Sequence, residues 1–187
     1  MSLEIITGPM FAGKSSAILS RVRRARILGW SCFLVTCAID TRYDMSGASI
    51  MTHDKEGVSA IGVKSLEGVK EMKDYKDSKL VIIEEGQFFP DLFDFVINAV
   101  EKEKKDVVVV GLDGDSDRKP FGKILDLIPY CDKITKLTSL CKRCGDGTSA
   151  IFSACVKGDK HGQQVCVGGA DMYEPMCRKH YLENQEK

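Results

Sequence analysis

The chain has 187 residues, of which 43% are hydrophobic and 29% are charged, as expected for one folded domain with a small appendage. Its 27 basic and 27 acidic residues balance to zero net charge, so it lacks the overall positive field that a general nucleic-acid binder uses. The apolar runs fall far short of the roughly 20 residues of a membrane-spanning helix, and the N-terminus does not resemble a secretory signal, so we expect a cytoplasmic protein with no membrane or nucleic-acid partner.

Short apolar, β-prone runs alternate with longer amphipathic stretches over residues 3–137, a pattern typical of a parallel sheet covered by helices. The predicted strands are residues 3–7, 32–36, 80–83, 107–112 and 134–137, and the predicted helices are residues 15–28, 66–73 and 91–103. Residues 40–56 carry turn formers and few periodic apolar side chains, which predicts a mobile loop over a ligand. The chain is therefore expected to have an α/β fold.

The segment between the first predicted strand and the first predicted helix satisfies the phosphate-binding loop (P-loop) pattern G-x-x-x-x-G-K-[ST]. Its glycines let backbone N–H groups face phosphate oxygens, its lysine reaches the β- and γ-phosphates, and its serine is a ligand for Mg²⁺. The predicted phosphate-binding residues are Gly8, Pro9, Met10, Phe11, Ala12, Gly13, Lys14 and Ser15. A chance glycine-containing turn is the alternative, but it does not account for the flanking strand and helix.

Glu84 and Glu85 directly follow a buried-looking strand, where a P-loop protein needs a carboxylate. Adjacent strand residues point to opposite faces of a sheet, so both reach the phosphates only where the strand breaks, and Gly86 allows such a break. One carboxylate would then serve Mg²⁺, while the other would orient or deprotonate an attacking hydroxyl. Two solvated charges at a strand end are the alternative interpretation.

The eight cysteines suit metal binding or core packing rather than disulfides in a reducing compartment. Four residues have the spacing and donor types of a closed structural zinc site: Cys141, Cys144, Cys177 and His180. Thirty-two residues separate the two halves, so the metal would close the base of a long loop. Within it, residues 150–156 and 164–167 predict a hairpin. The alternative is four unrelated residues, and we interpret the other five cysteines as core or incidental.

In chain order, these elements resemble the type II, zinc-containing thymidine kinase family over nearly the whole chain. Besides the P-loop and the zinc ligands, the resemblance rests on Asp40-Thr-Arg42-Tyr43 with Thr52-His-Asp54, Glu85-Gly-Gln-Phe-Phe-Pro90, Leu112-Asp-Gly114 with Arg118-Lys-Pro-Phe121, and Gly168-Gly-Ala-Asp-Met-Tyr173. It implies a RecA-like P-loop kinase domain with a parallel sheet and flanking helices at residues 1–139. A small zinc-binding β-hairpin domain would follow at residues 140–187, with a lasso loop at about 145–176 lying over the nucleoside.

The resemblance implies transfer of the γ-phosphoryl group of ATP to the 5′-hydroxyl of thymidine, and it leaves deoxyuridine open as an acceptor. Glu85 would be the general base, and Ser15 and Glu84 would bind Mg²⁺. The remaining implied phosphate contacts are Asp40, Arg42 and Gln87. The implied nucleoside contacts are Met10, Phe88, Leu112, Ser116, Phe121, Ser153, Gln164, Val165, Cys166, Val167, Gly168 and Tyr173. A homotetramer and feedback inhibition by thymidine triphosphate are also implied.

Three positions depart from the family pattern. Glu84 stands where aspartate is usual, and its extra methylene favours a metal contact through water. Ser116 stands where many relatives have phenylalanine, so the pocket is expected to lose an aromatic wall. Cys155 stands near a frequent arginine, after a short insertion at residues 145–148, which makes the assignment of Ser153 depend on register.

Two other classes of function remain open. A nucleotide-dependent switch or motor would use hydrolysis to act on a partner, although the chain has no N-K-x-D stretch to select guanine. A zinc-bearing binding module with a vestigial P-loop would explain the departures at Glu84 and Ser116. Phosphoryl transfer to a nucleoside distinguishes a kinase from both.

Overall fold

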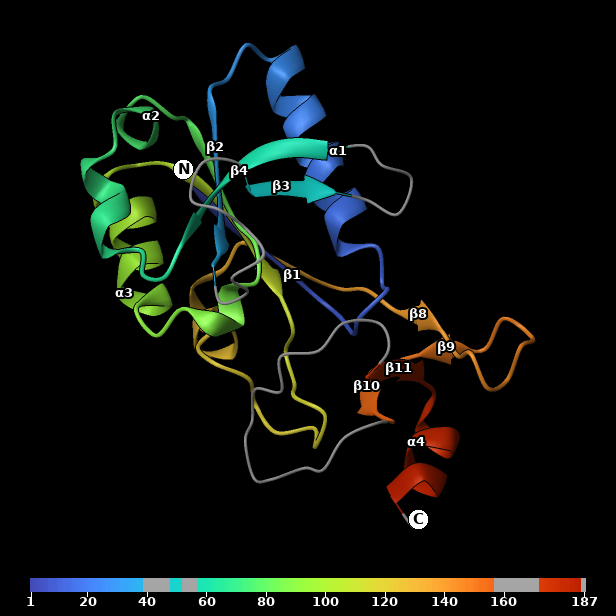
Figure 1. Ribbon diagram of the computed structural model, residues 1–187. Helices are drawn as coiled ribbons and strands as arrows, with labels where there is room; N and C mark the ends of the chain where they lie inside the picture. The colour runs from blue at the N-terminus through green and yellow to red at the C-terminus, as the bar shows by residue number, and fades with distance from the viewer. Residues whose placement is uncertain (39–47, 52–56, 157–171, 186–187) are drawn as a thin grey trace.

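A seven-stranded sheet forms the centre of the computed structural model, which describes residues 1–38, 48–51, 57–156 and 172–185 (Figure 1). The strands are β1 (Ser2–Thr7), β2 (Cys32–Cys37), β3 (Ala48–Met51), β4 (Gly57–Val63), β5 (Leu80–Ile83), β6 (Asp106–Gly111) and β7 (Lys133–Lys136). Their order across the sheet is β3-β4-β2-β5-β6-β1-β7. All pairings in this sheet are parallel except that of β3 with β4, so the predicted α/β fold is confirmed.

Helices cover both faces of the sheet, with α1 on one face and α2 and α3 on the other (Figure 1). The helical segments up to β7 are α1 (Lys14–Ile27), the 3₁₀ turn η1 (Glu67–Glu71), α2 (Lys73–Lys76), the 3₁₀ turn η2 (Gly86–Phe88), α3 (Leu92–Ile97), the π turn η3 (Asn98–Lys102) and the 3₁₀ segment η4 (Leu125–Tyr130). The single helix predicted at residues 66–73 is wrong, because η1 and α2 stand there with a break at Met72, whose backbone is extended. The helix predicted at 91–103 is α3 continued by η3.

Neighbouring strand residues feed two separate apolar cores, because successive side chains point to opposite faces of a sheet. One core joins α1 to the sheet and includes Ile6, Ile18, Val22, Ile82 and Val108. The other joins α3 to the opposite face and includes Ile5, Ile83, Leu92, Phe95 and Val109. With both faces covered, the carboxyl ends of β1, β5 and β6 meet at one edge of the sheet, where ligands bind in open α/β folds.

The loop predicted at residues 40–56 is wrong at Ala48–Met51, which forms β3 and pairs with β4. Its residues lack the alternating β-branched pattern that predicts a strand, so pairing with β4 decides their conformation. Residues 40–47 and 52–56 lie outside the described part of the chain. Among the described residues, every helix is too short or too polar to be a candidate for a membrane span.

After β7 the chain leaves the sheet and builds a small C-terminal unit (Figure 1). Its elements are β8 (Ser139–Leu140), β9 (Ser149–Ala150), β10 (Phe152–Cys155), β11 (Tyr173–Met176) and α4 (Arg178–Gln185). β8 pairs with β9 and β10 pairs with β11, both antiparallel. The predicted hairpin partner, residues 164–167, lies outside the described residues, and the partner of β10 in the structure is β11. The helix α4 was not predicted.

Gly122 allows a close approach of two backbones near the carboxyl edge of the sheet. Its φ is +61°, and a Cβ atom there would lie 2.1 Å from the carbonyl oxygen of Gln87. We therefore expect Gly122→Ala to lower the free energy of unfolding by about 2 kcal/mol or more, measured by urea denaturation. Gly68→Ala is the matched control, since its Cβ would meet nothing within 4 Å. Equal losses in the two variants would contradict the steric explanation.

Candidate active site and metal centre

The predicted P-loop lies between β1 and α1, at the carboxyl edge of the sheet. Gly8 and Gly13 have positive φ values of 148° and 80°, and Gly13 is the N-cap of α1. A Cβ atom at Gly8 would lie 2.6 Å from the carbonyl oxygen of Leu137, so this position requires glycine. The loop and the positive end of the α1 dipole form an arrangement that can bind phosphate.

The side chain of Lys14 folds back over the P-loop. Its Nζ atom donates hydrogen bonds to the carbonyl oxygens of Gly8 and Pro9, at 3.1 and 2.9 Å. Burial lowers the pKa of Lys14, while the negative charges nearby, led by Glu85, act to raise it. A desolvated ammonium group held in this way can exchange its carbonyl partners for phosphate oxygens.

The charges of Glu84 and Glu85 both act to raise the pKa of Lys14, so both carboxylates lie on its side of the sheet edge. They do so because the chain leaves β5 through an uncommon backbone conformation. Glu85 has φ 53° and ψ 40°, in the left-handed region that few non-glycine residues adopt. The predicted break of the strand is therefore present, but Glu85 makes it. Gly86 serves close packing instead, since a Cβ atom there would lie 3.0 Å from Val109.

Glu84 and Ser15 form the candidate magnesium site. Burial and the neighbouring Glu85 raise the pKa of Glu84 to about 7, against the opposing effects of Ser15, Thr36 and Lys14. The Oγ atom of Ser15 donates to Oε1 of Glu84 at 3.4 Å. A hydroxyl and a carboxylate oxygen are both donors that Mg²⁺ accepts, so the pair has the ligand chemistry of a magnesium site.

The structure describes six of the predicted nucleoside contacts besides Ser116: Met10, Phe88, Leu112, Phe121, Ser153 and Tyr173. The ring of Phe88 packs edge-on against that of Phe121, with centroids 5.4 Å apart. The backbone N–H of Met10 donates to Oγ of Ser153 at 2.9 Å, which joins β10 to the P-loop. Leu112 follows β6 and is half-buried, while Tyr173 begins β11. Seven further predicted phosphate and nucleoside contacts lie outside the described residues: Asp40, Arg42, Gln164, Val165, Cys166, Val167 and Gly168.

A cavity of about 180 Å³ lies where the P-loop, the loop after β6 and β10 meet. Its lining includes Gly8, Pro9, Asp113, Arg118, Phe152 and Ser153. The structure therefore provides space between the phosphate-binding edge and the C-terminal unit, on the side where Ser153 was predicted to meet a substrate.

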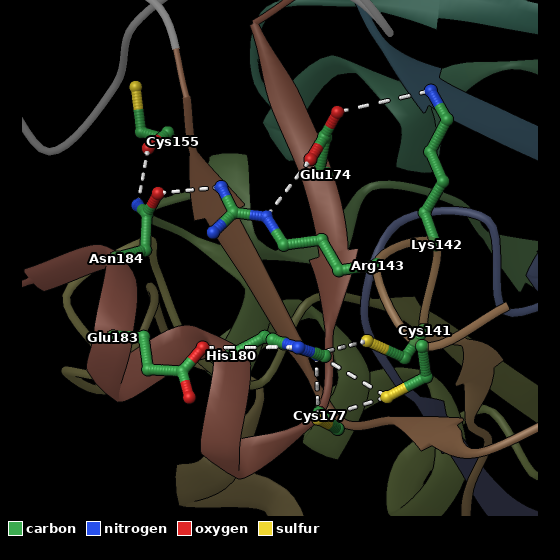
Figure 2. A network of polar contacts seen from close by, with 10 residues as sticks. Cys141, Lys142, Arg143, Cys155, Glu174, Cys177, His180, Glu183 and Asn184 are labelled. Atoms are coloured by element: carbon green, nitrogen blue, oxygen red, sulfur yellow. Dashed lines mark hydrogen bonds and ion pairs between the residues drawn. The ribbon is translucent and has the colours of Figure 1, made fainter.

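The four predicted zinc ligands lie together in the C-terminal unit, with their donor atoms within 4.8 Å of one another. Figure 2 shows His180 directed at the cysteines; its Nδ1 atom lies 3.4, 3.3 and 3.5 Å from the sulfurs of Cys141, Cys144 and Cys177. The sulfurs of Cys144 and Cys177 are 3.8 Å apart. Tetrahedral bonds to zinc imply separations of about 3.8 Å between sulfurs and about 3.5 Å from sulfur to nitrogen. Both the donors and their spacing fit a structural zinc ion.

A layer of polar contacts surrounds this cluster (Figure 2). Nε2 of His180 lies 3.9 Å from the carboxylate of Glu183. Arg143 donates to Oδ1 of Asn184 at 2.8 Å and lies 3.7 Å from Glu174 of β11. Asn184 in turn donates to the carbonyl oxygen of Cys155 at 3.2 Å. The segment between the first two cysteines is thus tied to β10, β11 and α4.

The thiols of the cluster differ in acidity. Burial raises the pKa of Cys141, but hydrogen bonds from the backbone of Cys177 and from His180 lower it to about 6. Burial and the bond to Cys141 raise the pKa of Cys144 to about 11. One thiolate is therefore favoured before a metal binds, and the next must lose its proton on binding, which makes metal affinity depend on pH.

Tyr181 connects the metal centre to the loop after β6 and was missed by the sequence analysis. It is 1% exposed, and its hydroxyl donates to the carbonyl oxygen of Ser116 at 2.6 Å. The guanidinium of Arg118 lies 4.7 Å from its ring. Its position directly after the predicted ligand His180 was the available signal, because a neighbour of a metal ligand lies close to the metal centre.

Known proteins are similar to this chain over nearly its whole length. A profile described as thymidine kinase matches residues 1–181. The chain belongs to the thymidine kinase family. "Thymidine kinase a" of Arabidopsis thaliana is 38% identical over 186 residues, which is 98% of this chain and 76% of that protein. "Thymidine kinase" of Variola virus is 38% identical over 182 residues, which is 97% of each chain. The resemblance drawn from the motifs is confirmed.

We expect Cys144→Ser to lose bound zinc, because a hydroxyl is a poor replacement for a thiolate ligand. The purified variant should contain much less than one zinc per chain by elemental analysis, and its thermal midpoint should fall by several degrees or more. Cys131→Ser is the matched control, since Cys131 lies outside the cluster and its thiol donates to the carbonyl oxygen of Ile128. Zinc content that is unchanged in Cys144→Ser would contradict the assignment.

The raised pKa of Glu84 gives a pH dependence with a defined sign. Between its ordinary value of 4.5 and about 7, the folded protein binds more protons at Glu84 than the unfolded chain does. This contribution to stability is therefore lost as the pH rises through that window. Without added Mg²⁺ or nucleotide, we expect Glu84→Gln to remove up to about 1 kcal/mol per pH unit of this slope, measured by urea denaturation. Glu71→Gln, an exposed control, should leave most of the slope in place, and an unchanged slope in Glu84→Gln would disprove the assignment.

Proposed function

We propose that the protein is an ATP-dependent thymidine kinase, which transfers the γ-phosphoryl group of ATP to the 5′-hydroxyl of thymidine. The observation that carries this proposal is the placement of Glu84 and Glu85 against Lys14 and Ser15 of the P-loop. A phosphate-binding loop with two carboxylates supplies both a cation site and a proton acceptor. Membership of the thymidine kinase family supports thymidine as the acceptor.

In this mechanism the P-loop amides and Lys14 bind the β- and γ-phosphates of ATP. Asp40, Arg42 and Gln87 are the further phosphate contacts that the family resemblance implies. Ser15 and Glu84 would hold Mg²⁺, which when bound neutralises charge on the phosphates. Glu85 accepts the proton of the 5′-hydroxyl while the new O–P bond forms and the bond from the γ-phosphorus to the leaving ADP breaks.

The C-terminal unit is proposed to hold the nucleoside. Residues 140–187 would form a zinc-stabilised domain whose lasso, at about 145–176, binds the base mainly through main-chain atoms of residues 165–168. The hydrogen bond between Ser153 and Met10 supports this arrangement, because it brings β10 to the P-loop. Ser116 would deprive the pocket of the aromatic wall that phenylalanine gives in relatives, so apolar contact with the thymine methyl group would select less strongly, and deoxyuridine, which lacks that methyl group, is proposed as a second acceptor.

Two properties of the assembled enzyme are proposed from the family resemblance. One is a homotetramer, which size-exclusion chromatography with light scattering would detect. The other is feedback inhibition by thymidine triphosphate, which can occupy the nucleoside and phosphate sites at once. Rate measurements with increasing thymidine triphosphate at fixed ATP and thymidine test the second property.

A coupled assay of ADP release with a panel of nucleosides tests the activity. We expect turnover that requires thymidine, and we expect Glu85→Gln to lower kcat by about 100-fold or more, because the base acts in the transition state. Glu71→Gln, at an exposed ion pair with Lys76, should keep the original kcat. ADP release without any nucleoside would favour a switch or motor, and nucleotide binding without turnover would favour a binding module.

A further inference from the structure

The side chain of Gln87 is buried beside the proposed base. Gln87 lies in η2 and is 4% exposed. Its Nε2 atom donates a hydrogen bond to Oε2 of Glu85 at 2.5 Å, and its Oε1 atom accepts one from the backbone N–H of Leu112 at 3.0 Å. The amide therefore bridges the carboxylate of Glu85 to the main chain just beyond β6. Both of its polar ends have partners within the protein.

Gln87 packs closely against two glycines. A Cβ atom on Gly111 would lie 2.2 Å from the side-chain oxygen Oε1 of Gln87, and a Cβ atom on Gly122 would lie 2.1 Å from the backbone carbonyl oxygen of Gln87. Side chains at these positions would displace the amide or the backbone of Gln87. The hydrogen bond from Gln87 to Glu85 therefore depends on the close packing of Gly111 at the end of β6 and of Gly122 before η4.

Glu85 needs such support for two physical reasons. Its backbone is left-handed, a conformation that costs about 1 kcal/mol or more and persists only where the surroundings enforce it. Its carboxylate is also attracted to the ammonium group of Lys14. The hydrogen bond from Gln87 restricts rotation of the carboxylate and engages Oε2 rather than Oε1.

We propose that Gln87 is a positioning residue that orients the carboxylate of Glu85 for proton acceptance. The proposal rests on the proposed function of Glu85 as general base. It differs from the phosphate contact that the family resemblance implies for Gln87, because the amide acts here through Glu85. The same bridge connects the base to Leu112, a predicted nucleoside contact, so the carboxylate and one wall of the pocket share a support.

A double-mutant cycle on the full-length protein tests the proposal. Gln87→Met keeps the length of the side chain but removes the donor. We expect it to lower kcat by about 10-fold or more, while KM for ATP and for thymidine changes by less than about 3-fold. In a Glu85→Gln background, Gln87→Met should cause no further loss of kcat, because its effect passes through Glu85.

Gln87→Glu is a second variant that protects the test against a failure to fold. It is nearly isosteric, and it places a second carboxyl group beside that of Glu85, so the two groups share one proton and Glu85 is no longer a free carboxylate. We expect the same fall in kcat with KM retained. Asn98→Asp on η3 is the matched control for an amide-to-carboxylate change away from the site and should keep the original kcat.

The outcomes separate this proposal from the proposed function. Equal losses of kcat from Gln87→Met in the original protein and in the Glu85→Gln background would overturn the positioning role and leave Glu85 as the base. A large rise in KM with kcat retained would also overturn it, in favour of direct substrate binding by Gln87. If Glu85→Gln alone retained full kcat, the base itself would be refuted, and the positioning role with it.

Discussion

The candidate active site depends on the burial of charged side chains, above all Lys14 and Glu84, at the carboxyl edge of the sheet. The same burial lowers the pKa of Lys14 and raises that of Glu84, because removal of water disfavours an ammonium ion and a carboxylate alike. Backbone carbonyls hold the ammonium, and a serine hydroxyl and an amide hold the carboxylates. The proposed ligand, a magnesium–nucleotide complex, would bring a cation to the carboxylates and anionic phosphates to Lys14.

The parallel sheet makes this concentration of charge possible. Both faces of β1, β5 and β6 are covered by apolar side chains from helices, so the polar residues lie where the strands end. The left-handed residue Glu85 then turns the chain sharply after β5, which brings two successive carboxylates to one side. Regular strand geometry would have placed them on opposite faces.

The C-terminal unit is joined to that edge through backbone contacts. Ser153 accepts a hydrogen bond from Met10, and Ser139 donates one to the carbonyl oxygen of Phe11. At the other end of the unit, Tyr181 of α4 reaches Ser116 in the loop after β6. Because Tyr181 directly follows the candidate ligand His180, a metal in the cysteine–histidine cluster would stabilise the position of this loop as well as the unit itself.

The sequence by itself determined the parts of this protein whose chemistry is local. The P-loop, the spacing of Cys141, Cys144, Cys177 and His180, and the buried parallel strands are all patterns of near neighbours, so they predict the α/β fold and the family. Only the tertiary structure decided the strand β3, the break between η1 and α2, and the bridge from Glu85 through Gln87 to Leu112. These features depend on packing between segments far apart in the chain, which override local preference and leave no periodic trace in the sequence.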